Sequence, residues 1–215
     1  LKERLTSIGQ RSINNVVDSA NYIMWITGQP MHAFDADKLT GRTISIRRAK
    51  AGEKLATLDN KDVELNDTVL VIADESDALA IAGIKGGKKA EVDNKTTNII
   101  LESANFHPTN IRKTSRAVGI KTDASYRFEH EISPEICLTA IDLLADLILS
   151  LAKTTNTKLG VVIDNYAKKQ KPYKVGASLS ETNNLLGLKL SHDDLLLILD
   201  KLQKYSGFVW EELNP

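Results

Sequence analysis

Residues Arg11 to Leu39 read RSINNVVDSANYIMWITGQPMHAFDADKL, and this stretch predicts the helix around which the chain folds. Its first half has apolar residues at helical spacing, namely Ile13, Val16, Val17, Ala20, Ile23 and Met24. Ser12 is the expected N-cap, and Gly28 stands where a left-handed C-cap belongs. Gly28 and Pro30 then turn the chain, so the sequence predicts an ordered loop that carries His32.

A second stripe on the same helix is polar. Asn14, Asp18 and Asn21 lie three or four residues apart, so they share a face away from the apolar one. Asn and Asp are poor helix formers, and their concentration there indicates a face with a function. His32 has two interpretations: an ordinary polar surface residue, or a site residue on a loop held by a rigid scaffold.

The pattern NNVVDxxNYxMxxxGQPMHAFDxDKL resembles the beta subunit of bacterial phenylalanyl-tRNA synthetase, in the domain that edits misacylated tRNA. The run is long and rich in rare residue types, and later segments agree in the same order. The resemblance covers about Leu1 to Asp164 well and the tail more loosely. It implies an α/β fold, with a mixed β-sheet and packed helices.

Composition sets limits on the function. Of 215 residues, 42% are hydrophobic and 26% charged, a balance typical of soluble globular proteins. Lys plus Arg equals Asp plus Glu at 28 each, and zero net charge disfavours a protein that mainly grips long duplex nucleic acid. A pocket for one nucleotide end remains compatible with that charge.

The single cysteine, Cys137, excludes a disulfide within the chain and fits a reducing cytoplasm. It lies in an apolar run and is interpreted as a small buried side chain. No run approaches the roughly 20 apolar residues of a membrane span, and no signal peptide is visible. The chain lacks an initial Met and stops in mid-pattern at Pro215, so we expect a piece of a longer protein.

A change of composition at KKQKP predicts a linker over residues 168–172. The resemblance implies an editing domain over 1–167 and the truncated start of a small winged-helix-like domain over 173–215. Within this tail we predict a strand-like lead at Tyr173–Leu179, helices at Ser180–Leu186 and His192–Lys204, and a strand at Phe208–Trp210. Ser191 and Asp194 resemble a capping box for the second helix.

Strands are predicted mainly between the central helix and residue 102. The ranges are Thr43–Arg48, Lys54–Leu58, Thr68–Ala73, Leu79–Ala82 and Thr97–Glu102, with a short return strand at Val161–Asp164. Thr68–Ala73 is densely β-branched, which predicts a buried central strand. Asp59-Asn60 marks a hairpin-like turn.

Two further helices are predicted, at Thr109–Val118 (opened by Pro108 and closed by Gly119) and Ile136–Leu151, and Leu1–Ile8 is predicted as a short charged helix or an extension that leads into the central helix. Ser133-Pro134-Glu135 is a strong start signal for the Ile136–Leu151 helix, with Ser133 as N-cap. This helix is apolar nearly all round, which predicts a buried pillar.

The glycine-rich turn AGIKGG, residues 82–87, has two interpretations. It is either an ordinary loop or a place where backbone must approach a ligand closely. It matches neither a P-loop nor a dinucleotide fingerprint. The resemblance implies that this turn lines the amino-acid pocket, with Ala82, Gly83 and Gly86 as substrate-binding residues. Lys85 departs from the family pattern, in which methionine is typical.

The remaining site residues are also implied by the resemblance. Glu102 corresponds to the acceptor of the tyrosine hydroxyl, and Thr122 and Ala124 border the pocket. His32 and Asn21 are the expected catalytic residues, which position the terminal ribose, the ester or the water. Ala20 stands where the family has threonine. Glu102 has a second interpretation, a solvated carboxylate at the end of a strand.

Basic residues gather after the predicted strands. Candidates for tRNA phosphate contacts are Arg112, Lys113, Arg116, Lys121 and Arg127. The alternative interpretation is a solvated helix face.

The chemistry expected here needs no metal or cofactor. The four histidines are scattered, and neither an HExxH motif nor a GxSxG elbow occurs. An aminoacyl-tRNA ester is activated, so a positioned water can suffice. ATP and magnesium are expected only for the intact synthetase. The implied partners are the acceptor end of tRNA(Phe) and the alpha subunit, with neither membrane nor DNA.

Two other classes of function remain open. One is a module that holds the acceptor end or scaffolds the subunit without chemistry. The other, a nucleotide-binding enzyme, is disfavoured because the phosphate motifs are absent.

Overall fold

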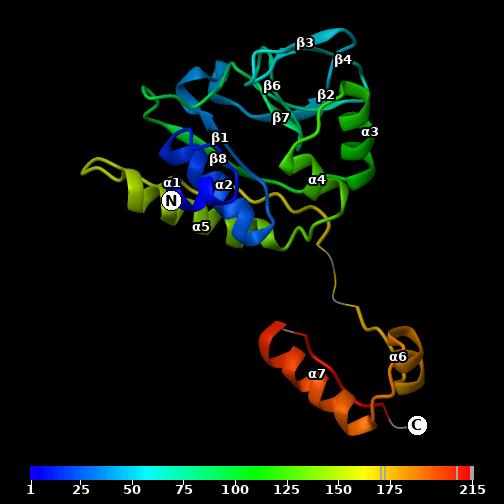
Figure 1. Cartoon of the computed structure of the whole chain (residues 1–215). Coiled ribbons are helices and arrows are strands. Elements are labelled where there is room, and N and C mark those ends of the chain that lie inside the picture. The colour runs from blue at the N-terminus through cyan, green and yellow to red at the C-terminus, as the bar shows by residue number, and fades with distance from the viewer. Residues whose placement is uncertain (170, 172, 207, 214–215) are drawn as a thin grey trace. The chain divides into compact units, whose positions relative to one another are not determined.

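The computed structural model describes residues 1–215 except 170, 172, 207, 214 and 215. It divides into two compact units, Leu1–Asp164 and Asn165–Pro215 (Figure 1). No helix among the described residues is long and apolar enough to cross a bilayer.

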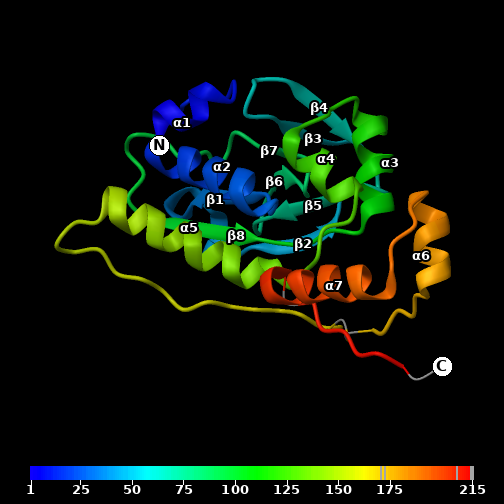
Figure 2. The same ribbon diagram turned by 60° about the horizontal axis from the view of Figure 1, so that its bottom comes forward.

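The first unit has a layer of helices on one face of a two-stranded sheet. α1 (Lys2–Ser7) precedes α2 (Asn15–Thr27), which packs with α5 (Ile136–Ala152) against β1 (Met31–Asp35) and β8 (Ile99–Ser103) (Figures 1 and 2). The buried side chains of this layer are Val16, Ala20, Ile23, Ala33, Val92, Ala140, Leu144 and Ile148. The apolar stripe of α2 is thus largely confirmed as the stripe that faces the core.

The N-terminus of α2 differs from the prediction. The N-cap is Asn14, whose side chain accepts a hydrogen bond from the Val17 amide at 2.9 Å, and not Ser12. Ser12 instead donates its hydroxyl to the Asp18 carboxylate at 2.5 Å. That carboxylate also accepts from the Ile13 amide at 2.8 Å and is buried. Asn14 and Asp18 therefore fasten the helix start, which explains most of the polar stripe without a ligand.

The end of α2 follows the prediction, because Gly28 caps it with a φ of 80°. His32, however, lies on strand β1 and not on a loop, since the chain pairs with β8 directly after Pro30. Buried Gln29 fixes this entry by donating its side-chain amide to the backbone oxygens of Pro30 and Ala104.

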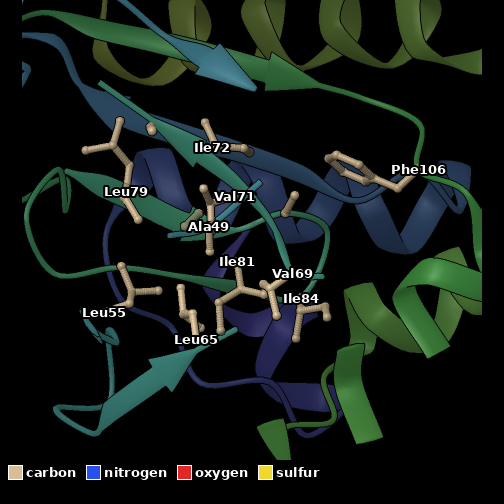
Figure 3. Packing of buried hydrophobic residues seen from close by; sticks show 14 of the residues in the cluster. Ala49, Leu55, Leu65, Val69, Val71, Ile72, Leu79, Ile81, Ile84 and Phe106 are labelled. Carbon is tan, nitrogen blue, oxygen red and sulfur yellow. The ribbon is translucent and has the colours of Figure 1, made fainter. Parts of the chain in front are cut away.

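A second sheet covers the other face of β1 and β8. Its strands are β2 (Ser45–Arg48), β5 (Leu70–Ala73), β6 (Ala78–Ile81) and β7 (Lys85–Gly86), in the order β2-β5-β6-β7. The prediction of a buried central strand is confirmed by β5, which has a neighbour on each side. Figure 3 shows the core that this sheet shares with Leu55, Leu65 and Phe106.

The remaining elements close this unit. β3 (Glu53–Ala56) and β4 (Asp62–Leu65) form a hairpin, and Asn60 in the predicted turn has a φ of 59°. Two short 3-10 helices, η1 (Ala36–Lys38) and η2 (Thr40–Arg42), follow β1. α3 (Pro108–Val118) and α4 (Asp123–Glu129) pack on each other, and Gly119 caps α3 with a φ of 67° as predicted. The α/β class is confirmed, but the described strands form three antiparallel sheets and not one mixed sheet.

α5 is present as predicted, but it is not a buried pillar. Only Ala140, Leu144 and Ile148 are buried, because the helix lies on the outside of the unit and presents one face to it. The expected N-cap is also wrong, since Glu135 holds that position and no side chain caps the helix.

Three predicted strands are absent, each in a stretch whose residues are all described: Val161–Asp164, Tyr173–Leu179 and Phe208–Trp210. Most of their apolar residues lie exposed, and none of these stretches pairs with another described strand.

The second unit contains α6 (Leu179–Leu186), capped by Gly187, and α7 (His192–Ser206). Both helices were predicted, and the Ser191–Asp194 capping box is confirmed by reciprocal bonds of 2.6 to 3.2 Å. The winged-helix-like character stays a prediction. Residues 170 and 172 of the predicted linker lie outside the described residues.

Candidate functional site

His32 and Glu102 stand side by side on the sheet made by β1 and β8. They are direct partners in the antiparallel register. Residues opposite each other on antiparallel strands point to the same face, so both side chains project toward the second sheet. Both line one cavity of about 80 Å³.

The cavity has an apolar wall and a polar one. The apolar wall contains Ile72, Ile81, Ile84, Phe106 and Phe128. Phe106 and Phe128 meet edge to face with ring centroids 5.0 Å apart. In Figure 3, Phe106 comes from the segment after β8, and Ile72, Ile81 and Ile84 come from the second sheet and its last turn. The cavity therefore lies where the two sheets meet.

The two polar side chains lack partners. Across the described residues, neither the Glu102 carboxylate nor the His32 imidazole has a hydrogen bond or ion pair; His32 only packs edge-on against Phe34 with centroids 4.5 Å apart. Burial raises the pKa of Glu102 to about 7 and lowers the pKa of His32 to about 4. Near neutral pH the histidine is therefore uncharged, and the carboxyl group is present in both forms. Glu102 thus faces the cavity from within strand β8, and its role as the hydroxyl acceptor stays a prediction.

The glycine turn between β6 and β7 approaches the cavity as predicted. Gly83 has a φ of 68°, and a Cβ there would lie 2.7 Å from the Phe106 ring. A Cβ on Gly86 would lie 2.8 Å from Cε1 of His32. Both glycines line the cavity, whereas Ala82 is buried outside the lining. Side chains at either glycine position would collide with the walls, so the turn needs its glycines.

Lys85, the departure from the family pattern, also lines the cavity. Its ammonium lies 3.4 Å from the Asp59 carboxylate, in the turn between β3 and β4. That turn is tied to β7 by the Leu58 amide, which donates to the Gly86 oxygen at 3.1 Å. A cation therefore stands at the rim of the cavity, held by a neighbouring hairpin.

Helix α4 supplies one of its two predicted residues to the cavity. Ala124 is in the lining, but Thr122 is the N-cap of α4 and accepts from the Ser125 amide at 3.0 Å. The Thr122 hydroxyl also donates to the Ile84 oxygen at 2.9 Å, which ties the helix to the glycine turn. Thr122 thus supports the cavity indirectly, by fixing the start of α4 against the glycine turn.

Other predicted residues lie apart from the cavity. Asn21 and Ala20 on α2 are absent from its lining. Arg112, Lys113, Arg116 and Lys121 are exposed, as phosphate contacts must be. Arg127 is separate from them, because its guanidinium lies 4.5 Å over the Trp25 ring and donates to the Asp123 oxygen.

The sequence did not predict the residues of the apolar wall. Phe106, Phe128 and Ile72 gave no signal beyond hydrophobicity, and only packing brings them together. No group of three or more His, Cys, Asp or Glu side chains in the described part of the chain could hold a metal ion.

Comparisons with known proteins agree with this architecture. Residues 1–153 match the family described as the B3/4 domain. The chain is 42% identical over 216 residues to a phenylalanine–tRNA ligase beta subunit of Geobacter metallireducens, covering 99% of this chain and 26% of the relative. The corresponding protein of Carboxydothermus hydrogenoformans is 44% identical over 202 residues, and that of Aquifex aeolicus 43% over 203, each covering 94% of this chain.

The chain spans about a quarter of the length of these relatives. Their names agree with the family that the segment around His32 resembles, so the recognition made from the sequence is confirmed. The chain belongs to the B3/4 domain family and is similar, over nearly all of its length, to the beta subunits of phenylalanine–tRNA ligases.

Proposed function

We propose that this cavity hydrolyses the ester of tyrosine wrongly attached to tRNA(Phe), as part of a phenylalanine–tRNA ligase beta subunit. The observation that carries the proposal is the unpartnered Glu102 carboxylate, which faces a cavity with a wall of apolar side chains. A buried polar group without a partner is unfavourable. A ligand that brings a hydroxyl to Glu102 relieves that penalty, and a ligand without one does not.

This arrangement suits a second sieve. A synthetic pocket built for phenylalanine rejects an added hydroxyl only weakly, by about 100-fold. A second site that requires the hydroxyl selects the wrong product. Glu102 accepts a hydrogen bond from the phenolic hydroxyl, while Phe106 and Phe128 contact the ring.

His32 stands beside Glu102 on the neighbouring strand and also faces the ligand in this proposal. Because its pKa is lowered to about 4, the neutral imidazole accepts or donates a hydrogen bond near pH 7. It has no carboxylate partner among the described residues that would strengthen it as a base. We assign it to positioning the ester or the water, which attacks the carbonyl carbon and releases tyrosine and tRNA. Asn21 lies outside the cavity lining, and its role in positioning the ribose, the ester or the water stays a prediction.

The size of the cavity adds a requirement. Its volume is about 80 Å³, whereas an apolar cavity of about 150 Å³ binds benzene. We therefore expect the rim, where Lys85 lies, to widen when a phenol ring enters. A rim that stays closed would favour the alternative, a degenerate site in a module that only holds the acceptor end or scaffolds the subunit.

The same proposal places the chain in the cytoplasm with an alpha subunit as partner. tRNA phosphates would meet Arg112, Lys113, Arg116 and Lys121. The hydrolytic step uses no cofactor from this chain, and ATP with magnesium belongs to the synthetic reaction of the intact ligase.

The test is release of tyrosine from preformed Tyr-tRNA(Phe) by the intact ligase under single-turnover conditions. Glu102→Ala and His32→Gln are each expected to slow release by at least tenfold and to leave phenylalanine charging unchanged. Glu64→Ala, which removes an exposed glutamate on β4, is the matched control and should change neither reaction. Equal release by all four proteins, or no release by the wild type, would leave the non-catalytic module as the function.

A further inference from the structure

A salt bridge stands at the rim of the cavity, between β7 and the turn that joins β3 to β4. The Lys85 ammonium lies 3.4 Å from Oδ1 of Asp59, and these side chains are 24% and 45% exposed, respectively. Of the described side chains that line the cavity, Lys85 carries the one ammonium group and Glu102 the one carboxylate. Asp59 is thus a second carboxylate, which reaches the rim through its ion pair with Lys85.

The Asp59 carboxylate is held in place by a partner other than Lys85. The hydroxyl of Thr57, a buried residue, donates to Oδ1 of Asp59 at 2.6 Å. This bond is the main cause that lowers the pKa of Asp59 to about 2, and the Lys85 charge is a smaller one. Asp59 is therefore a positioned anion near neutral pH.

The turn that carries Asp59 is tied to the cavity wall by backbone bonds. The Leu58 amide donates to the Gly86 oxygen at 3.1 Å, and the Lys88 amide donates to the last oxygen of β3 at 2.8 Å. The Lys85 side chain is the mobile member of the ion pair, because a flexible four-carbon stem separates its ammonium from the backbone. An ion pair this exposed contributes little to stability, so another cation can replace Lys85 at small cost.

The same turn approaches the histidine of the cavity. A Cβ on Gly86 would lie 2.9 Å from Cδ1 of Leu58 and 2.8 Å from Cε1 of His32, so both side chains approach the same face of this glycine. Asp59 follows Leu58 directly in the chain. The turn therefore brings its carboxylate to the side of the cavity where His32 is assigned to the ester or the water.

An aminoacyl ester carries a cation beside its ester carbonyl. Its α-amino group has a reference pKa of about 7.7 to 8.0, so it is largely an ammonium near pH 7. An anionic acceptor binds an ammonium more strongly than a neutral one does, and Glu102 is already matched with the phenolic hydroxyl. We propose that Asp59 binds the α-ammonium group of the ligand, and that the Lys85 ammonium occupies this carboxylate until the ligand displaces it. The proposal rests on the proposed function, which supplies the ester.

NMR titration of the whole chain with two amides tests this assignment. Tyrosinamide has the phenol and the α-ammonium, whereas 3-(4-hydroxyphenyl)propanamide has the phenol alone, so contacts with Glu102 are common to both. At about pH 6.5, where the ammonium form predominates, both amides should shift the ring protons of His32. Hydrogen bonds to charged groups contribute about 10- to 150-fold in affinity, and because Asp59 is half exposed we expect tyrosinamide to bind about tenfold more tightly.

Two substitutions should change the affinity for tyrosinamide in opposite directions. Asp59→Asn keeps an oxygen for the Thr57 hydroxyl but removes the charge, so it should abolish the preference for tyrosinamide. Lys85→Met keeps an apolar stem and removes the competing ammonium, so it should tighten tyrosinamide binding by up to about fivefold and leave propanamide binding unchanged. Asp62→Asn changes an exposed aspartate on β4 of the same hairpin, and this matched control should alter neither affinity.

Several outcomes of the titration would overturn the proposal. These are equal affinities of the two amides for the wild type, no shift of His32 with either amide, and a preference that Asp59→Asn retains. Tyrosinamide binding that is unchanged or weaker in Lys85→Met would also overturn it, since the two substitutions would then only break an ion pair.

Tyrosine release by the intact ligase separates this inference from the proposed function. A wild type that prefers tyrosinamide through Asp59 but releases no tyrosine from Tyr-tRNA(Phe) would refute the editing proposal alone. A wild type that releases tyrosine but binds both amides equally would refute the role of Asp59 alone.

Discussion

Asp74 and Glu102 are two carboxylates inside the same unit, and their surroundings are opposite. The Asp74 side chain is fully buried and accepts hydrogen bonds from the amides of Thr40, Ser76 and Asp77 at 2.8 to 2.9 Å. Lys89 adds an ion pair at 2.7 Å. Although burial alone raises it, these bonds hold the pKa of Asp74 well below its usual range.

Glu102 has none of these partners, and burial raises its pKa to about 7. The difference separates a structural role from a functional one. A carboxylate whose oxygens are all satisfied joins parts of the fold, here η2 and the turn between β5 and β6. A carboxylate left unsatisfied beside a cavity keeps its oxygens for a ligand.

The largest expected effect is the loss of stability on removing Asp74, the carboxylate whose oxygens all have partners. Asp74→Ala leaves three backbone amides without their acceptor and removes the buried carboxylate that pairs with Lys89, and breaking a buried pair costs about 3 to 5 kcal/mol. Chemical denaturation should show a loss of that size. Asp77→Ala is the control, because that side chain is 62% exposed and its ion pair with Lys89 contributes less than about 1 kcal/mol. Equal losses would mean that burial does not distinguish the two.

The pH dependence of the free energy of unfolding tests the environment of Glu102 and His32, the side chains without partners. Folded Glu102 keeps its proton to about pH 7 against an ordinary pKa of 4.5, so over that range the folded state binds more protons and stability falls as pH rises. His32 has a pKa of about 4 against 6.5, so the unfolded state binds more protons and stability rises with pH. In the wild type the two effects oppose each other.

Replacing one of these two residues should reveal the pH dependence of stability that the other contributes. Glu102→Gln is expected to make stability rise more steeply with pH between 4.5 and 6.5, and His32→Gln to make it fall relative to wild type, each by about 2 kcal/mol. Urea unfolding at several pH values measures both slopes. Three parallel curves would contradict the assigned pKa shifts.

A smaller effect is expected at the glycine turn. Gly86→Ala places a methyl group 2.8 Å from His32 Cε1 and 2.9 Å from Leu58 Cδ1, so one of them must move. Overpacking of this kind costs about 1 to 2 kcal/mol, and the displaced imidazole should slow tyrosine release as well. Gly160→Ala meets no atom within 4 Å and should change neither stability nor release. Full activity of Gly86→Ala would place His32 outside the mechanism.

The smallest effect concerns Thr122, predicted from the sequence as a pocket residue. As an N-cap it contributes about 1 kcal/mol, which Thr122→Ala removes and Thr122→Ser retains. Thermal unfolding of the two variants decides the role. A Thr122→Ala protein that keeps wild-type stability but releases tyrosine more slowly would show that the Thr122 hydroxyl acts in the cavity and not as an N-cap.

Local signals in the sequence predicted much of the fold. Helix α2 and its glycine cap, the buried strand β5 and the basic helix α3 all followed from spacing and turn residues within a few positions. The errors arose where two local choices were equally good or where long-range pairing decides. Ser12 and Asn14 are both good N-caps, and the exposed Val161–Asp164 segment is rich in β-branched residues, as strands are, but finds no partner among the described strands.

The site was predictable only through its resemblance to a family. His32 and Glu102 lie 70 positions apart and meet through the register of β1 and β8, which no local pattern specifies. The ring contacts of Phe106 and Phe128 arise from tertiary packing in the same way. The burial that raises the pKa of Glu102 likewise depends on the assembled sheets.

The central claim is that unpartnered Glu102 selects for a hydroxyl, and the ratio of two hydrolysis rates tests it most directly. The intact ligase is given preformed Tyr-tRNA(Phe) and Phe-tRNA(Phe) in parallel, with wild type and Glu102→Gln measured under the same conditions. The wild type should release tyrosine much faster than phenylalanine. Glutamine cannot offer a charged acceptor, so Glu102→Gln should lower the tyrosine-to-phenylalanine ratio by at least tenfold. An unchanged ratio would contradict the claim and assign the selection of tyrosine to other residues.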